Sequence, residues 1–149
     1  MATPARANGR LPRLVATDLD GTLVRSDETV SDYAMTVLRK VHEAGITVVG
    51  VTGRGARLIE LCRRDLPEAD FFVLAQGGYV LDQRDSDEPR VLRRQQIPGP
   101  DLAKALGLLE AEVGPLSVLV EALEDPRAPT AGLIERRRPR DPAPAPGAR

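Results

Sequence analysis

Two carboxylates lie two positions apart, directly after an apolar run at residues 14–17. They are Asp18 and Asp20, and Gly21 follows the second. Because side chains alternate along an extended chain, both carboxylates point to the same side where the strand ends. Two negative charges held so close cost free energy unless a cation lies between them. The pair therefore predicts a strand end at which a cation is bound.

Residues beside this pair, and a second group downstream, are of types that bind anions. Gly21 permits a sharp turn, and Thr22 offers a hydroxyl and an amide to whatever the turn encloses. Residues 52–54, with the sequence Thr-Gly-Arg, follow another apolar run. Taken alone, the first group is compatible with an aspartate-rich turn held by side-chain to backbone hydrogen bonds, and the second with an ordinary strand-to-helix turn. The elements around a motif decide between such interpretations.

The elements that must position these groups are three short apolar strands, expected at residues 14–17, 46–51 and 71–75. Their aliphatic and β-branched character is typical of strands buried in a parallel sheet. A strand, a helix and a second strand imply a right-handed crossover and parallel pairing. The fold class is therefore α/β, with a Rossmann-like parallel sheet. Both turns then lie at the edge where such sheets bind ligands.

Two helices are expected between these strands. Ser31 is a suitable N-cap for the first, whose apolar residues recur at helical spacing until Gly45 ends it. The second is expected at residues 56–64, with Cys62 on its buried side as a small core residue.

In this setting residues 18–22, Asp-Leu-Asp-Gly-Thr, resemble the first motif of the haloacid dehalogenase-like (HAD) phosphohydrolases, and residues 52–54 resemble the second. The resemblance implies that Asp18 is the nucleophile, which attacks phosphorus and forms an aspartyl-phosphate. It implies that Asp20 is the general acid and base, which protonates the leaving oxygen and later activates water. It also implies that the Thr52 hydroxyl holds a phosphoryl oxygen.

The resemblance implies further phosphate-binding residues. Gly21 and Thr22 belong to the first turn, and the amide of Gly53 acts from the start of the next helix. Arg54 points either at the anion or into solvent.

The resemblance also implies the cofactor and the substrate class. The cofactor is Mg²⁺, a hard ion that prefers oxygen ligands and keeps several waters, with Asp18 and the backbone carbonyl of Asp20 as its protein ligands. It offsets the repulsion between the attacking carboxylate and the phosphate. The substrate is a small phosphorylated metabolite, which in the Cof-like branch of the family is selected by a cap.

The pattern changes after the third strand. Residues 79–81 and 91–93 predict a β-hairpin, Asp101 predicts a helix N-cap, and residues 116–123 predict a further strand. This order resembles the start of the α/β cap of the Cof-like branch, in which Gln76 takes the place of a common asparagine. The Pro-, Ala- and Arg-rich composition that follows predicts disorder. The predicted organisation is a flexible leader at 1–12, a HAD-like core at 13–78, a partial cap at 79–124 and a disordered tail at 125–149.

Composition excludes several other classes. The net charge of −1 lacks the basic excess that binds nucleic acid. The single cysteine excludes an internal disulfide framework and a cysteine-cluster zinc site, and fits a reducing compartment. No apolar run approaches the ~20 residues of a membrane span. We therefore expect no nucleic-acid partner, no membrane association and a cytoplasmic location.

Two further motifs of the family are missing. The third motif is a lysine that stabilises the phosphorylated intermediate, and the fourth is a Gly-Asp pair that completes the Mg²⁺ site. The only lysines, Lys40 and Lys104, lie on predicted helices ahead of any place for the third motif, and residues 124–125, Glu-Asp, lack the glycine. The resemblance therefore stops within the cap, as in a truncated chain.

Two functions follow from this division. One is a Mg²⁺-dependent phosphohydrolase, and the alternative is a catalytically incomplete remnant or a phosphate- and Mg²⁺-binding module. Missing strands would also leave a sheet edge and an apolar face uncovered, which predicts instability or self-association.

Overall fold

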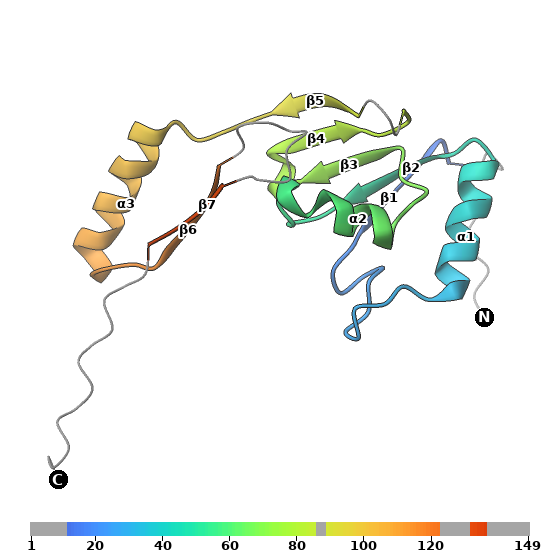
Figure 1. Ribbon diagram of the computed structural model, residues 1–149, viewed down its shortest axis with the longest axis horizontal. Helices are drawn as coiled ribbons and strands as arrows, with labels where there is room; N and C mark the ends of the chain where they lie inside the picture. Colours follow the sequence, from blue (N-terminus) through green and yellow to red (C-terminus); the bar gives the residue numbers. More distant parts are fainter. Residues whose placement is uncertain (1–11, 86–88, 123–131, 137–149) are drawn as a thin grey trace, which may run out of the picture. The chain divides into compact units, whose positions relative to one another are not determined.

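The structure, a computed structural model, describes residues 12–85, 89–122 and 132–136 (Figure 1). The chain divides into two compact units, one up to Gln95 and one from Gln96. Among the described residues, no helix combines the length and the apolar character that a membrane span requires.

The first unit is built on one mixed sheet. Its strands are β1 (Leu14–Asp18), β2 (Thr47–Val51), β3 (Phe71–Leu74), β4 (Tyr79–Asp82) and β5 (Arg90–Arg94), and they lie in this order across the sheet (Figure 1). β2 is parallel to β1 and to β3, whereas β4 is antiparallel to β3 and to β5. The α/β class, the parallel sheet and the hairpin are confirmed. Since β4 and β5 continue the sheet of β1–β3, the expected boundary between core and cap at residue 79 stays a prediction.

The helices of this unit begin and end close to the expected residues. α1 (Asp32–Glu43) has Ser31 as its N-cap, because the Ser31 hydroxyl oxygen accepts a hydrogen bond from the Ala34 amide at 3.2 Å. The second helix has two parts, a 3₁₀ turn at Ala56–Leu58 followed by α2 (Ile59–Asp65). α1 packs against β2, as the crossover requires.

The core lies around β2, β3 and the end of α2. Its fully buried side chains include Val48, Cys62, Leu66 and Phe72. β2 has a glycine at position 50 because a Cβ atom there would lie 2.5 Å from the Phe72 ring. Cys62 is a core residue, as expected.

β1 differs from the buried strand that its sequence predicts. Its burial alternates between exposed and half-buried residues, and Leu14 is 52% exposed. The reason is its place in the sheet, since β1 is at one end of the strand order and pairs only with β2 among the described strands. The first strand is therefore an edge strand in the part of the chain that the structure describes.

The second unit contains α3 (Gly99–Val113) and a two-stranded antiparallel sheet of β6 (Val118–Ala122) and β7 (Gly132–Arg136). The helix and the first of these strands were expected. Asp101 as the N-cap was wrong: the cap is Pro98, and Asp101 lies in the first turn. The helix begins earlier because proline is tolerated in a first turn, where a backbone donor has no partner in the helix.

β7 lies inside the segment whose composition predicts disorder. Its five residues pair with β6 in register from Gly132 to Arg136. The prediction of disorder came from the average composition of the whole Pro- and Arg-rich segment. That average does not reveal a short run with two large aliphatic residues, Leu133 and Ile134. The other parts of the predicted tail, and residues 1–11 of the leader predicted at 1–12, lie outside the described residues.

Candidate active site

The turn that carries the two carboxylates is fixed by buried residues at both ends. Leu19 and Val24 are buried, and the Val24 amide donates to the Leu19 carbonyl at 2.8 Å. Gly21 lies between them with φ +80°, a conformation that side chains strongly disfavour. The turn holds Asp18 and Asp20 exposed at the carboxyl end of β1.

Strand register brings the second predicted group beside the first. Asp18 pairs with Val51, the last residue of β2, so the chain leaves both strands at the same edge. Thr52, the next residue, is buried, and its amide donates to the Val73 carbonyl of β3 at 2.9 Å. As predicted, the structure places Asp18, Asp20 and Thr52 together at the carboxyl-terminal edge of the sheet.

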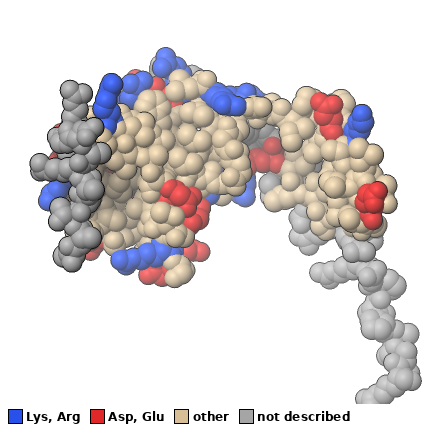
Figure 2. Space-filling model, turned by 180° about the vertical axis from the view of Figure 1, so that it is seen from behind, with Lys and Arg blue, Asp and Glu red and all other residues tan. Residues whose placement is uncertain are grey.

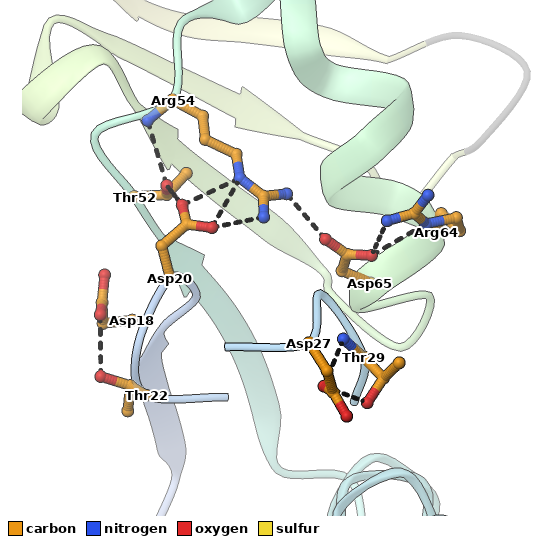
Figure 3. A network of polar contacts seen from close by, with 9 residues as sticks. All are labelled: Asp18, Asp20, Thr22, Asp27, Thr29, Thr52, Arg54, Arg64 and Asp65. Atoms are coloured by element: carbon orange, nitrogen blue, oxygen red, sulfur yellow. Dashed lines mark hydrogen bonds and ion pairs between the residues drawn. The ribbon is translucent and has the colours of Figure 1, made fainter. Parts of the chain in front are cut away.

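The two carboxylates have different partners (Figure 3). Asp18 Oδ2 accepts a hydrogen bond from the Thr22 hydroxyl at 2.8 Å. Asp20 turns toward Arg54, whose Nε donates to Oδ2 at 2.9 Å and to Oδ1 at 3.1 Å, while Nη2 also donates to Oδ1. A protein side chain, Arg54, therefore supplies positive charge beside the acidic pair.

Arg54 keeps Asp20 ionised. Its hydrogen bonds hold the pKa of the Asp20 carboxyl below the ordinary value, against a smaller opposite effect of burial, and the Thr52 hydroxyl contributes at 3.3 Å. Burial on its own would lower the pKa of Arg54, but the hydrogen bonds to Asp20 and Asp65 outweigh it and raise that pKa. Both groups are charged at neutral pH.

The Arg54 side chain was expected to point either at the anion or into solvent, and the structure excludes the orientation into solvent. Its side chain is only 11% exposed, because Nη1 donates to Asp65 Oδ2 at 2.7 Å while the opposite edge of the guanidinium holds Asp20 (Figure 3). The reasoning from sequence missed Asp65. Asp65 follows two arginines in the sequence, and such a run of charges usually indicates a solvated surface. The sequence therefore gives no sign that this acid belongs to the site.

The Thr52 hydroxyl serves the protein's own network in this structure. It donates to Asp20 Oδ2 and accepts from the Arg54 amide at 3.1 Å. Gly53 is exposed, but the helical turn after it begins at Ala56, so its amide is not at a helix start as expected. Gly53 therefore belongs to an open loop between β2 and the helix.

A third turn packs on this loop. Ala75 and Gln76 have φ values of +50° and +56°, and Gly77 follows with +89°. The Ala75 amide donates to the Arg54 carbonyl at 2.9 Å, and Gln76 Nε2 lies 2.7 Å from the place of a Cβ atom on Gly53. The left-handed conformation costs free energy at Ala75 and Gln76 but not at Gly77, and this turn places Gln76 against the site.

The oxygen donors at the site are of the kind that a divalent cation binds. In the described part of the chain, no group of three or more His, Cys, Asp or Glu residues could hold a metal. The exposed Asp18 carboxylate and the Asp20 carbonyl are hard oxygen donors, whereas the Asp20 carboxylate is taken by Arg54. Mg²⁺ uses one or two carboxylates and keeps several waters, so these donors fit it, and Asp18 and the Asp20 carbonyl would be its protein ligands.

Comparison with known proteins assigns the chain to a family. The family model of the haloacid dehalogenase-like hydrolases matches residues 15–125. HMP-PP phosphatase of Enterobacter sp. (strain 638) is 34% identical over 96 residues, which are 62% of this chain and 32% of that protein. The 5-amino-6-(5-phospho-D-ribitylamino)uracil phosphatase YcsE of Bacillus subtilis (strain 168) is 30% identical over 70 residues, 47% of this chain and 28% of that protein.

A solved structure shows the same fold. The phosphatase BT1666 of Bacteroides thetaiotaomicron superposes with a TM-score of 0.68 at 24% identity, over 93% of this chain and 46% of that one. The chain spans about a third of the length of the two curated relatives, 32% and 28%.

Proposed function

The chain belongs to the haloacid dehalogenase-like hydrolases, and we propose that it carries the nucleophile and the acid–base group of a Mg²⁺-dependent phosphohydrolase that acts on a small phosphorylated metabolite. The observation that carries the proposal is the register of β1 with β2, in which Asp18 lies opposite Val51. It sets the Asp18 and Asp20 turn beside the loop of Thr52 and Arg54.

The proposed reaction has two displacements at phosphorus. An oxygen of Asp18 attacks, the bond from phosphorus to the leaving oxygen breaks, and Asp20 gives that oxygen a proton. Asp20 then takes a proton from the water that cleaves the aspartyl-phosphate and releases inorganic phosphate. Mg²⁺, held by Asp18 and the Asp20 carbonyl, would neutralise phosphate charge as the carboxylate approaches.

Asp20 starts this sequence in the ionised form, which is the form of a base. To act first as an acid it needs a proton, and Arg54 opposes that protonation. A phosphate dianion is an acceptor that competes with Asp20 for the Arg54 guanidinium. Binding of substrate would therefore loosen Asp20 from Arg54, raise its pKa and let it take a proton from water, which it then gives to the leaving oxygen.

The substrate class follows from the relatives. Their names give phosphorylated small molecules as substrates, HMP-PP and a phosphoribitylamino-uracil. Together with the net charge of only −1, these names support a small metabolite as the substrate. The cytoplasm as the location of the chain stays a prediction.

A second candidate function is a binding module that does not turn over. Two observations favour it. Lys40 is in the last turn of α1, which leads into the amino end of β2, so it lies at the sheet edge opposite Asp18 and does not supply the lysine of the third motif. The metal donors of the described residues are also few. Loss of one charge-stabilising group commonly lowers kcat by about 10²–10³.

Hydrolysis of p-nitrophenyl phosphate with and without Mg²⁺ separates the two functions. The matched variant is Asp18→Asn, which keeps the shape of the side chain and removes the nucleophile. Mg²⁺-dependent turnover that is lost in this variant supports the enzyme. If the folded chain is no faster than the variant, yet binds inorganic phosphate in the presence of Mg²⁺, the binding module is correct.

A further inference from the structure

Asp65 is a buried acid in a place that does not favour one. It is the last residue of α2, where the helix dipole favours a cation, and it is 5% exposed. A carboxylate at such a place needs positive partners. It has two, Arg64 and Arg54.

The two partners bind different oxygens of the carboxylate (Figure 3). Arg64, a 62% exposed side chain, donates to Oδ1 from Nε at 2.9 Å and from Nη2 at 2.8 Å. Arg54 donates to Oδ2 from Nη1 alone, at 2.7 Å. Arg64 already places two donors on one oxygen of Asp65, so the buried charge has a counter-charge besides Arg54.

Arg54 gains an orientation from this contact. A guanidinium is planar and rigid, so an anchored Nη1 restricts where the opposite edge can point. That edge, Nε with Nη2, holds both oxygens of Asp20. Asp20 is 55% exposed, whereas the side chain of Asp65 is 4% exposed, so the rigid end of the bridge is Asp65.

We propose that Asp65 is a positioning residue, which aims the guanidinium of Arg54 and through it holds the carboxylate of Asp20 at the sheet edge. The catalytic meaning of this bridge rests on the proposed function, because it assumes that Asp20 transfers protons to and from the reacting oxygens. The bridge itself runs from the end of α2 through the loop after β2 to the turn after β1.

Arginine side-chain NMR tests the bridge without any need for activity. The probe is the Arg54 Nε–H resonance, assigned in the unsubstituted chain and in Asp20→Asn, which shows the signal without a carboxylate partner. In Asp65→Asn we expect this resonance to move toward its Asp20→Asn position and its exchange with water to rise about tenfold, the effect of one lost charge-assisted hydrogen bond. Arg64→Ala, which removes the other partner of Asp65, is the control and should leave the signal unchanged. An unchanged Arg54 signal in folded Asp65→Asn overturns the proposal.

The unsubstituted chain gives a second test if Asp65→Asn does not fold. At low temperature the Nη1 protons of Arg54, which face Asp65, should exchange with water at least about tenfold more slowly than Nε–H, which faces Asp20. Equal rates, or the reverse order, would mean that Asp65 is not the rigid end.

Activity adds a readout that separates this proposal from the proposed function. With measurable turnover of p-nitrophenyl phosphate, Asp65→Asn should lower kcat/KM about tenfold, because the guanidinium that Asp65 aims meets both Asp20 and the phosphate. Turnover that is unchanged in Asp65→Asn contradicts the positioning role. If the unsubstituted chain has no turnover, the proposed function fails, while the NMR experiments still decide whether Asp65 aims Arg54.

Discussion

At the scale of single residues, the site is organised by one arginine between two acids. Arg54 shares its guanidinium between the exposed Asp20 and the buried Asp65. Isolated ion pairs at the surface contribute little to stability, whereas a buried charge that loses its partner is costly. The two ends of the bridge therefore differ in what they do: the buried end contributes to folding and the exposed end to the site.

Replacing Arg54 tests the buried end. We expect Arg54→Ala to lower the free energy of unfolding by about 3 kcal/mol, near the lower end for a broken buried ion pair, since Arg64 still holds the other oxygen of Asp65. Urea denaturation measures this change. Arg64→Ala, an exposed partner of the same carboxylate, should cost less than about 1 kcal/mol. Equal losses of unfolding free energy in the two variants would show that the Arg54–Asp65 pair stabilises the fold no more than the exposed Arg64–Asp65 pair does.

At the scale of elements, the sequence predicts what depends on local patterns. Ser31 and Gly45 bound α1 because capping and left-handed φ values are properties of a few neighbouring residues. Asp18, Asp20 and Thr52 could be placed at one edge because parallel pairing follows from the order of the elements.

Features that depend on distant partners could not be predicted. β1 is half exposed because of its place in the strand order, and β7 forms where β6 offers a partner. The contact of Arg54 with Asp65 depends on how α2 packs beside the loop after β2, and no spacing in the sequence encodes that packing.

The β4–β5 hairpin contains an acid whose effect on stability depends on pH. Asp82, the last residue of β4, accepts hydrogen bonds from Arg84 Nε at 3.0 Å and Nη2 at 2.7 Å, and from Arg90 Nη2 at 3.3 Å. The hydrogen bonds from Arg84 hold the pKa of Asp82 well below its ordinary range. The guanidinium of Arg84 also lies over the Phe71 ring, 4.9 Å from its centroid.

Acid should therefore weaken the hairpin. Because the folded pKa is lowered, the unfolded chain takes up the proton first, and the stabilisation is complete above about pH 4, the unfolded value, and is lost as pH falls toward the folded pKa. Asp82→Asn should flatten the fall in the free energy of unfolding below about pH 4. Urea titrations at several pH values measure it. A slope equal to that of the unsubstituted chain would contradict the prediction.

At the scale of the whole molecule, apolar surface is left uncovered in both units. α3 has no buried residue, and Leu108, Val113 and Leu119 of the second unit are 65%, 64% and 60% exposed. In the first unit β1 is one of the two edge strands of the described sheet, and its Leu14 is exposed. The face in Figure 2 is mostly uncharged, with its acidic and basic side chains scattered over it. Such surfaces are typical of sites that associate.

We therefore expect the chain to self-associate as its concentration rises, which sedimentation velocity would measure. Leu14→Lys places a charge on the β1 edge, and Leu108→Lys places one on α3, so the pair of variants shows which surface is used. The open edge predicts that Leu14→Lys shifts the equilibrium toward the monomer. A monomer at all concentrations with one sharp thermal transition would contradict the prediction.

The bond between Asp20 and Arg54 joins residues 34 positions apart. A peptide that carried only one of the two motifs would lack half of the site, because neither motif holds its own counter-charge. The site forms when β1 pairs with β2. This pairing closes a long loop and is slow compared with local hairpin formation. The hydrogen bonds of Arg54 to Asp20 therefore report long-range order. If the Nε–H resonance of Arg54 has its native position, the two parallel strands have already paired.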